Sequence, residues 1–499
     1  MNKTVLSFVL ATLCAAGHAA RTTTPVPPAI VIPDMVDTRI GTLRFHDGVP
    51  DQASVTKLYD NLDFLRGVDA YLNAIPGASM VALRRGLRSI GAEKGAIAVF
   101  DDLMDARSLV LTGNSESVYA MTWLDLKDGP LVVESPPNTL GVVDDFWFRY
   151  VADLGNAGPD KGKGGKFLFL PPGYQGAVPE GYHVFRSPTF GNLLIWRAFT
   201  VNGDPKPGAA NVRQHARVYP LAQAANPLAP SFVNASGKVF NTIHANDYSY
   251  YEELNELIQE EPSAALDAER LGQLAGLGMV KGKPFAPDAR LRKILAEAAV
   301  VGAATARAQS YATRDREAYF YPGSQWRTPF IGNSYSFTKD GATLLDARSM
   351  FFYMAVVTTP AMTVKRPGVG SQYAFSANDQ QGRPLDGGCN YRITLPPNPP
   401  AKNFWSLVAY DTTTRSMLQT DQPFPSVNTS TPGVVKNADG ATDVYFGPQP
   451  PAGKAGNWVQ TLPGKGWSVL LRLYGPLEPW FDKSWQPGDI VLLPSANCR

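Results

Sequence analysis

The sequence predicts a mainly β protein with α-helical segments (α+β), built from two antiparallel β-sandwich domains. Two stretches of the 499-residue chain alternate short apolar runs with turn residues, and a helical stretch lies between them. The composition agrees, because 24 Phe, 20 Tyr and 9 Trp suit pleated strands and 45 Gly and 42 Pro suit turns. A chain of this length also exceeds one ordinary hydrophobic core, which favours several domains.

The first 20 residues have the pattern of a Sec-type signal peptide. Lys3 supplies a positive charge, Val5 to Ala16 form a short apolar run, and small residues follow it. We expect cleavage near Ala19 or Ala20, and therefore a protein of the periplasm or the extracellular space. The apolar run is shorter than the ~20 residues that a membrane span needs. No later run is long enough either, so we expect no integral membrane segment after cleavage.

Changes of pattern along the chain predict its domain order. Val55, Leu58 and Leu62 fall at helical spacing, and Pro76-Gly77 is expected to break that helix. Asp288 is a suitable N-cap for a later Ala-rich helix. The predicted parts are a signal peptide at 1–20, a Pro- and Thr-rich linker at 21–38, a helical segment at 39–94, a first β-sandwich at 95–230, a helical segment at 231–318 and a second β-sandwich at 319–499.

Short apolar runs separated by Gly, Pro, Asn and Asp predict the strands of both sandwiches. In the first, the expected strands are Ser108–Thr112, Val118–Leu124, Gly129–Glu134, Asp145–Ala152, Lys166–Leu170, Tyr182–Phe185 and Leu193–Val201. In the second, they are Tyr391–Leu395, Trp405–Asp411, Asp443–Gly447, Trp458–Thr461 and Trp467–Tyr474.

The charge balance is almost neutral, with a formal net charge of +2. A chain that binds nucleic acid carries a marked excess of basic residues. We therefore expect no nucleic-acid partner.

The common sequence signatures of catalysis are absent. His46, His183, His215 and His244 form no HxH or HExxH pair, so no local metal motif exists. There is no GxSxG nucleophile elbow, no GxGxxG and no P-loop. We therefore expect no metal and no cofactor.

Paired carboxylates are the remaining candidates for chemistry. Asp144 and Asp145 are predicted to open a strand with Trp147 and Tyr150, and Glu134 ends the preceding strand. A carboxyl beside aromatic rings can be a general acid with a raised pKa, or it can contact a sugar. The alternative is an exposed turn that leads into a core strand. Trp147 and Tyr150 are candidate ligand-binding residues in the first interpretation.

Four further residues are candidates for ligand binding. Arg186 lies in a loop where it binds an acidic ligand or holds a turn through carbonyl groups. Tyr321, Trp326 and Arg327 form an aromatic loop that lines a carbohydrate groove or packs at a domain junction.

Two cysteines, Cys389 and Cys498, remain after removal of the signal peptide. In an oxidising compartment they could form one disulfide that ties the C-terminus down. The alternative is two unpaired thiols.

Several stretches form a pattern that is specific in combination. They include SPPNTLGVVDDFWFRYVADLGNAG at 135–158, PPGYQGAVPEGYHVFRSPT at 171–189, GCNYRITLPPNPPAKNFWSLVAYD at 388–411 and GNWVQTLPGKGWSVLLRLYGP at 456–476. The first two resemble the DUF1254 module and the last two the DUF1214 module of a family of exported bacterial proteins. The resemblance covers most of the mature chain.

This resemblance implies two jelly-roll-like β-sandwiches, and it carries no catalytic motif to these positions. Three classes of function stay open: a ligand-binding or structural assembly protein of the cell envelope, expected as a homo-oligomer; a metal-independent hydrolase of glycans or amide-linked polymers, which would use Asp144, Asp145 and Glu134; and a binding protein with a small-molecule pocket between the domains. A small molecule or a glycan is the expected ligand.

Overall fold

The computed structural model describes residues 24–93, 95–494 and 498. The signal peptide predicted at 1–20 lies outside the described residues. The chain divides into two compact units, 1–62 and 63–499. Among the described residues, no helix has the length and apolarity that a membrane crossing requires.

The first unit contains a small antiparallel sheet in the order β1-β2-β3. Its elements are η1 (Pro28–Ile30), β1 (Met35–Thr38), β2 (Gly41–His46) and β3 (Val49–Pro50), followed by the start of α1 (Gln52–Ser89). Asp47 and Gly48 both have positive φ, as a two-residue hairpin turn between paired strands requires. The predicted linker therefore ends in a strand, and the predicted helical segment begins with two strands.

Helix α1 continues through Pro76, so the predicted break at Pro76-Gly77 is wrong. Proline removes one backbone hydrogen bond from a helix. Here Ile75 and Ala78, on either side of it, are completely buried. A Cβ on Gly77 would lie 2.9 Å from Leu257 and from the Trp147 ring, so this glycine allows close packing. Burial on both sides of the proline keeps the helix continuous.

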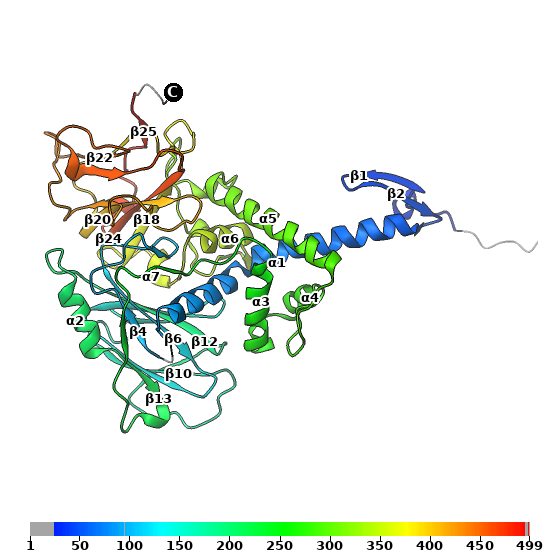
Figure 1. The fold of residues 1–499 in the computed structure, drawn as a ribbon, viewed down its shortest axis with the longest axis horizontal. Coiled ribbons are helices and arrows are strands. Elements are labelled where there is room, and N and C mark those ends of the chain that lie inside the picture. Colours follow the sequence, from blue (N-terminus) through cyan, green and yellow to red (C-terminus); the bar gives the residue numbers. More distant parts are fainter. Residues whose placement is uncertain (1–23, 94, 495–497, 499) are drawn as a thin grey trace, which may run out of the picture. The chain divides into compact units, whose positions relative to one another are not determined.

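Within the second unit, the first sandwich has a six-stranded sheet, β14-β4-β6-β12-β8-β9, and a four-stranded sheet, β11-β10-β7-β13 (Figure 1). Val99 and Leu194 from the larger sheet share one buried core with Phe167 and Phe169 from the smaller. The bounds are β4 (Ile97–Val99), β6 (Val118–Asp125), β7 (Leu131–Ser135), β8 (Thr139–Asp145), β9 (Tyr150–Gly155), β10 (Gly165–Leu170), β11 (His183–Arg186), β12 (Gly191–Ala198), α2 (Lys206–His215), β13 (Arg217–Pro220) and β14 (Phe232–Asn234).

The strand predicted at Asp145–Ala152 is wrong in its position. Residues 139–145 form β8, and a turn then leads into β9 at Tyr150. The carboxylate of Asp145 accepts hydrogen bonds from the backbone N–H groups of Trp147 and Arg149, at 2.8 and 2.9 Å. These bonds hold the turn, in which Phe148 has a positive φ. An aromatic run suggests a strand, but the side-chain bonds of Asp145 favour a turn here.

The second sandwich pairs the sheet β18-β24-β20-β21 with the sheet β23-β22-β19-β25. Trp467 and Leu471 of one sheet share a buried core with Ile393 and Phe446 of the other. The bounds are β18 (Ser371–Ser376), β19 (Tyr391–Leu395), β20 (Ala401–Asp411), β21 (Ser426–Asn428), β22 (Thr442–Gly447), β23 (Trp458–Gln460), β24 (Trp467–Pro476) and β25 (Val491–Leu492).

A disulfide joins Cys389 to Cys498 across 109 residues of sequence, with the two Cα atoms 5.8 Å apart. Both cysteines are buried in the core of the second sandwich. Of the two alternatives that the sequence left open, the structure has the paired one.

Eight strands of each sandwich repeat one topology, and β4 and β14 of the first have no counterpart in the second. The order β6-β12-β8-β9 in the first corresponds to β18-β24-β20-β21 in the second, and β11-β10-β7-β13 corresponds to β23-β22-β19-β25. The strand directions repeat as well: in each of the two sheets β11-β10-β7-β13 and β23-β22-β19-β25 one pair is parallel, β11 with β10 and β23 with β22. Strands with the same rank in this order therefore occupy equivalent positions.

The remaining helices and short elements lie between the sandwiches or within their loops. The helices are α3 (Ser249–Glu260), α4 (Ala268–Ala275), α5 (Ala289–Tyr311), α6 (Leu345–Met354), α7 (Pro360–Thr363) and α8 (Glu478–Phe481). The short elements are β5 (Ser108–Leu109), η2 (Leu221–Gln223), β15 (Phe240–Asn241), η3 (Ser263–Ala265), η4 (Arg316–Ala318), η5 (Ile331–Asn333), β16 (Thr338–Lys339), β17 (Ala342–Thr343) and η6 (Ala455–Asn457). As predicted, Asp288 caps α5, accepting from the backbone N–H of Leu291.

Two glycines provide a matched test of helix packing. A Cβ on Gly302 of α5 would lie 2.6 Å from the buried ring of Tyr71, whereas nothing lies within 4 Å of one on Gly272 of α4. We expect Gly302→Ala to lower the free energy of unfolding by roughly 1–3 kcal/mol. Gly272→Ala should raise it by up to about 1 kcal/mol, since alanine favours a helix. Urea unfolding measures both, and equal effects would contradict the packing described here.

Candidate functional site

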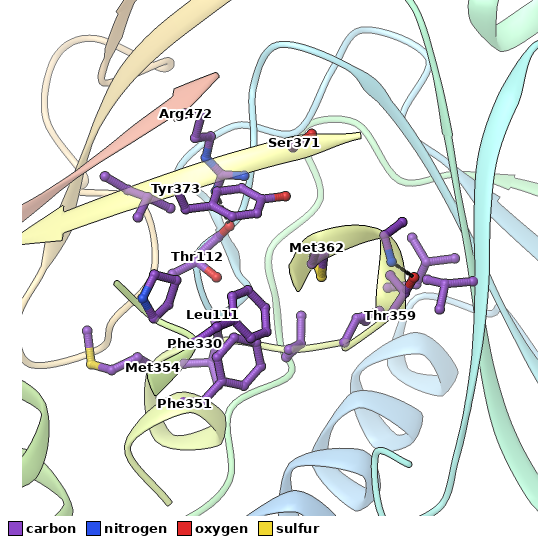
Figure 2. Close-up of a pocket in the computed structure, with 18 of the residues that line it drawn as sticks. Leu111, Thr112, Phe330, Phe351, Met354, Thr359, Met362, Ser371, Tyr373 and Arg472 are labelled. Atoms are coloured by element: carbon purple, nitrogen blue, oxygen red, sulfur yellow. Dashed lines mark hydrogen bonds between the residues drawn. The ribbon is translucent and has the colours of Figure 1, made fainter. Parts of the chain in front are cut away.

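A cavity of about 140 Å³ lies between the two sandwiches. Both sandwiches and the segment between them contribute to its wall. Phe330, Phe351, Met354 and Met362 make much of it apolar, and Figure 2 shows Tyr373 and Arg472 across from the two phenylalanine rings. Cavities of about 150 Å³ with aliphatic and aromatic walls accept benzene. The volume therefore suits one small ring or a short aliphatic chain.

Equivalent strands place the same residues on this wall. Arg197 of β12 lies opposite Tyr119 of β6, and Arg472 of β24 lies opposite Tyr373 of β18. Two positions away on each strand, the pair Ile195 and Met121 corresponds to the pair Leu470 and Phe375. All eight side chains line the cavity. Each sandwich thus contributes one arginine–tyrosine pair and one apolar pair to a shared wall.

Arg472 is 3% exposed and connects the two sandwiches. Its Nη2 donates to the carbonyl oxygen of Thr112 at 2.6 Å and to the hydroxyl oxygen of Tyr410 at 2.8 Å. Its Nε has no partner among the described residues. Arg197 is only partly buried, and Tyr373 is its hydrogen-bonding neighbour.

The pKa of Tyr373 depends on the guanidinium groups of both Arg197 and Arg472. Burial alone would raise the pKa of its phenol, but the positive charges of Arg197 and Arg472 outweigh burial and lower the pKa. Arg472 also lies over the Tyr373 ring, 5.6 Å from the centroid. The wall around Tyr373 is therefore electropositive.

A buried acid lies elsewhere on the wall. Asp153 of β9 accepts a hydrogen bond from the Thr359 hydroxyl at 3.0 Å. Burial raises the pKa of Asp153 to about 6, although that hydrogen bond favours the charged form. The neighbouring Asp144 accepts from the backbone N–H of Thr358 at 2.9 Å, and burial raises its pKa well above the usual range. The two aspartates hold the segment that connects α6 to α7.

A second cavity, of about 490 Å³, contains two of the predicted ligand-binding residues. Trp147 and Tyr150 line it together with Tyr335 and Arg348. The Tyr150 and Tyr335 rings meet edge to face, with centroids 5.7 Å apart. Burial lowers the pKa of Arg348 to about 10.

The three candidate catalytic carboxylates are not gathered at one place. Asp144 and Asp145 are on β8, 1% and 0% exposed, so the exposed-turn alternative does not describe them. Asp145 is tied to Arg149, whose Nε donates to it at 2.7 Å. Glu134 belongs to β7 in the other sheet, where it accepts from the Tyr219 hydroxyl at 2.7 Å.

The four other candidates have separate positions. Arg186 is exposed at the end of β11 and donates to the carbonyl oxygen of Tyr174 at 2.9 Å. Tyr321 and Trp326 are buried and donate to the carbonyl oxygens of Trp485 and Gly488. Arg327 lines the cavity between the sandwiches and donates to the carbonyl oxygen of Ser310 at 3.0 Å.

Within the described residues, no group of three or more His, Cys, Asp or Glu side chains is arranged to hold a metal ion.

Sequence reasoning missed Tyr119, Arg197, Tyr373 and Arg472. A signal was present, because Arg197 in GNLLIWRA and Arg472 in WSVLLRLYGP are charged residues inside apolar strands. Buried charge is rare in a strand unless it is paired or functional. The sequence does not show that the two strands are equivalent and line the same cavity.

The fold and the cavity define a two-sandwich α+β protein with an internal site between equivalent halves. The family model described as protein of unknown function (DUF1254) matches residues 95–220, and that of protein of unknown function (DUF1214) matches residues 370–478. The chain therefore belongs to the proteins that carry both domains, as the resemblance implied.

A solved structure supports the fold. The VPA0106 protein from Vibrio parahaemolyticus is similar over 87% of this chain and 100% of its own, with 18% identity and a TM-score of 0.53. A putative uncharacterized protein from Burkholderia cenocepacia is similar over 88% of this chain and 98% of its own, with 13% identity and a TM-score of 0.39. No curated protein sequence matches.

The raised pKa of Asp153 predicts a pH-dependent stability. Its carboxyl keeps a proton in the folded state up to about pH 6, while the unfolded chain loses it near the usual 3.8. Its contribution to stability is complete below pH 3.8 and is lost as the pH rises through 6. Relative to Asp153→Asn, the free energy of unfolding of the wild type should fall by up to about 3 kcal/mol between pH 4 and 7. Urea unfolding across this range measures it.

Asp128→Asn, at an exposed turn position, is the control for the substitution itself. A difference between wild type and Asp153→Asn that stays constant with pH would contradict the proposed titration.

Proposed function

We propose that this protein is an exported ligand-binding protein of the cell envelope, and that its ligand is a small, largely apolar molecule held between the two sandwiches. The observation that carries the proposal is the cavity of about 140 Å³, with apolar walls and a few convergent polar groups. Ligand sites of proteins have this composition, and they commonly lie where domains meet.

The wall is suited to a small ring. The Phe330 and Phe351 rings pack with centroids 4.7 Å apart, and Met354 and Met362 lie on the same wall. Aromatic rings provide edges and faces for stacking, while methionine side chains adapt to irregular shapes. A ring or short chain of matching size would remove this surface from water.

Two observations support export. The pattern of residues 1–20 is typical of a signal peptide. The Cys389–Cys498 disulfide is the kind of bond that persists in an oxidising compartment such as the periplasm. Homo-oligomer formation stays a prediction.

A hydrolase is a weaker candidate. Glycosidases with paired carboxylates need both groups to face one cleft, about 5–9 Å apart. Glu134 is in a different sheet from Asp144 and Asp145, and each has hydrogen-bonding partners within the fold.

A thermal-shift screen tests the binding proposal. The mature protein, purified with its disulfide intact, would be melted with small aromatic and six-carbon aliphatic compounds in neutral, anionic and cationic forms. A ligand at 100 times its Kd adds about 2.7 kcal/mol to stability. We expect at least one small compound to raise the Tm by several degrees.

Filling the cavity should remove that shift. Val142→Phe on β8 and Met354→Trp on α6 add bulk to two different parts of the wall. We expect each to weaken binding at least tenfold while circular dichroism and cooperative melting are retained. Val184→Phe, at an exposed position on β11, is the matched control. Binding that survives both filling variants would place the ligand elsewhere.

A further inference from the structure

We infer that the ligand of the cavity carries an anionic group, and that the duplicated Arg197 and Arg472 bind it. The inference rests on the proposed function, which it extends from a small apolar molecule to a small acid. The predicted class is a compact carboxylic acid with an aromatic or short aliphatic tail.

The first argument is the charge on the wall. Arg197, Arg327 and Arg472 line the cavity, while Asp153 is its only carboxylate among the described residues. A guanidinium that is removed from water is costly unless a negative charge or a full set of acceptors accompanies it. Arg472 is almost fully buried, and its Nε has no partner. The cavity wall therefore carries more arginines than carboxylates, and one donor of Arg472 is free for an acceptor.

The second argument is the repetition. The two arginines occupy the same rank in equivalent strands, each opposite a tyrosine, and all four side chains reach one cavity. An arginine that only stabilised its own sandwich would not need to meet its equivalent at a shared wall. Guanidinium groups bind carboxylates through paired N–H donors, so two of them can hold one head group from two sides.

The two acids near these arginines have hydrogen-bond partners of their own. Burial raises the pKa of Glu116, the positive charge of Arg472 opposes this rise, and the Glu116 Oε1 accepts from the Ser115 hydroxyl. Asp153 is bound to Thr359, and burial raises its pKa to about 6. The lowered pKa of Tyr373 reflects the positive charges of Arg197 and Arg472, together with hydrogen bonds to Ser371 and Arg197. An incoming anion would balance that charge directly.

The shape of the site orients the ligand. Tyr373, Ser371 and Arg472 lie on one side of the cavity, and Phe330 and Phe351 lie across from them (Figure 2). The buried hydroxyl of Ser371 lies beside the Tyr373 phenol and contributes to lowering its pKa. The head group therefore belongs beside β18 and β24, and the tail belongs against the phenylalanine rings.

Four probes of nearly equal shape separate charge from size: benzoate (anionic), benzamide and nitrobenzene (neutral), and benzamidine (cationic). Isothermal titration calorimetry on the full mature protein at pH 7 measures each Kd. We expect benzoate to bind at least tenfold more tightly than either neutral probe, and benzamidine to show no binding. Phenyl phosphate is a further arm that distinguishes a carboxylate head from a phosphate head on the same arginines.

Variants locate the anion. Arg197→Gln and Tyr373→Phe should each weaken benzoate binding at least tenfold and leave nitrobenzene binding within twofold of the wild type. Arg472→Gln should do the same if it folds, but it also removes bonds that join the sandwiches. Arg197→Gln loses a hydrogen bond to Tyr373 but none to the backbone of the other sandwich, and it is therefore the deciding variant, with circular dichroism and cooperative melting as its folding check. Arg186→Gln, at an exposed arginine outside the cavity, is the matched control and should leave both affinities unchanged.

The outcomes are distinct. Equal binding of benzoate and the neutral probes, abolished by Val142→Phe, would overturn the anion inference and leave the proposed function intact. Preferential benzoate binding that Arg197→Gln does not weaken would also overturn it. Absence of binding by every probe and by every compound of the thermal-shift screen would overturn both proposals. Tighter binding of phenyl phosphate, lost in Arg197→Gln, would support the anion site and replace the carboxylate by a phosphate.

Discussion

The arrangement of the two sandwiches depends on one buried cation. Arg472 of the second sandwich donates to the carbonyl oxygens of Thr112 and Gly113 of the first, and Tyr410 donates to Gly113 at 2.7 Å. A guanidinium at 3% exposure must have acceptors, and the segment before β6 supplies them. Asn114 extends the same contact by donating to the hydroxyl of Tyr474. Polar groups that can be satisfied in only one docked arrangement hold the sandwiches in register, which is also what shapes the cavity between them.

The repeated topology explains why both sandwiches place an arginine–tyrosine pair at this junction. Because β12 and β24 have equivalent positions, their inward-facing residues fall on corresponding surfaces, and both surfaces meet at the cavity. The shared apolar core continues from these strands into α1, α3, α5 and α6, and α6 and α7 contribute Met354 and Met362 to the cavity wall. Two weakly similar halves thus make one site that neither half forms alone. The aspartates on β8 and β9 add a second constraint, since they hold the segment from α6 to α7 through Thr358 and Thr359.

Local patterns predicted more of the fold than of the site. The apolar runs that became β10, β12, β22 and β24 were identified, since short apolar runs between turn residues are visible in sequence, and these strands are buried at almost every position. Two predictions were wrong because contacts outweighed local preference. Hydrogen bonds to the Asp145 carboxylate stabilise a turn within the aromatic run predicted as a strand at Asp145–Ala152. Burial keeps α1 helical through Pro76, where a break was predicted. Of the candidate site residues, Trp147, Tyr150 and Arg327 line cavities, whereas Tyr321 and Trp326 are buried in packing and Glu134 is in another sheet.

The sequence by itself determined the α+β class and the two β-rich halves with helices between them, because these rest on composition and short-range periodicity. The family came from a resemblance carried by specific stretches at 135–158, 171–189, 388–411 and 456–476. Only the tertiary structure decided that Cys389 meets Cys498, that Asp144 is buried, and that Arg197 and Arg472 face one cavity. The reason is physical. Strand and turn preferences act over a few residues, whereas the two arginines are brought together by strand pairing and sandwich docking across more than half of the chain. A charged residue in an apolar strand indicates a buried polar contact or a functional site, but its partner is known only once the strands are paired.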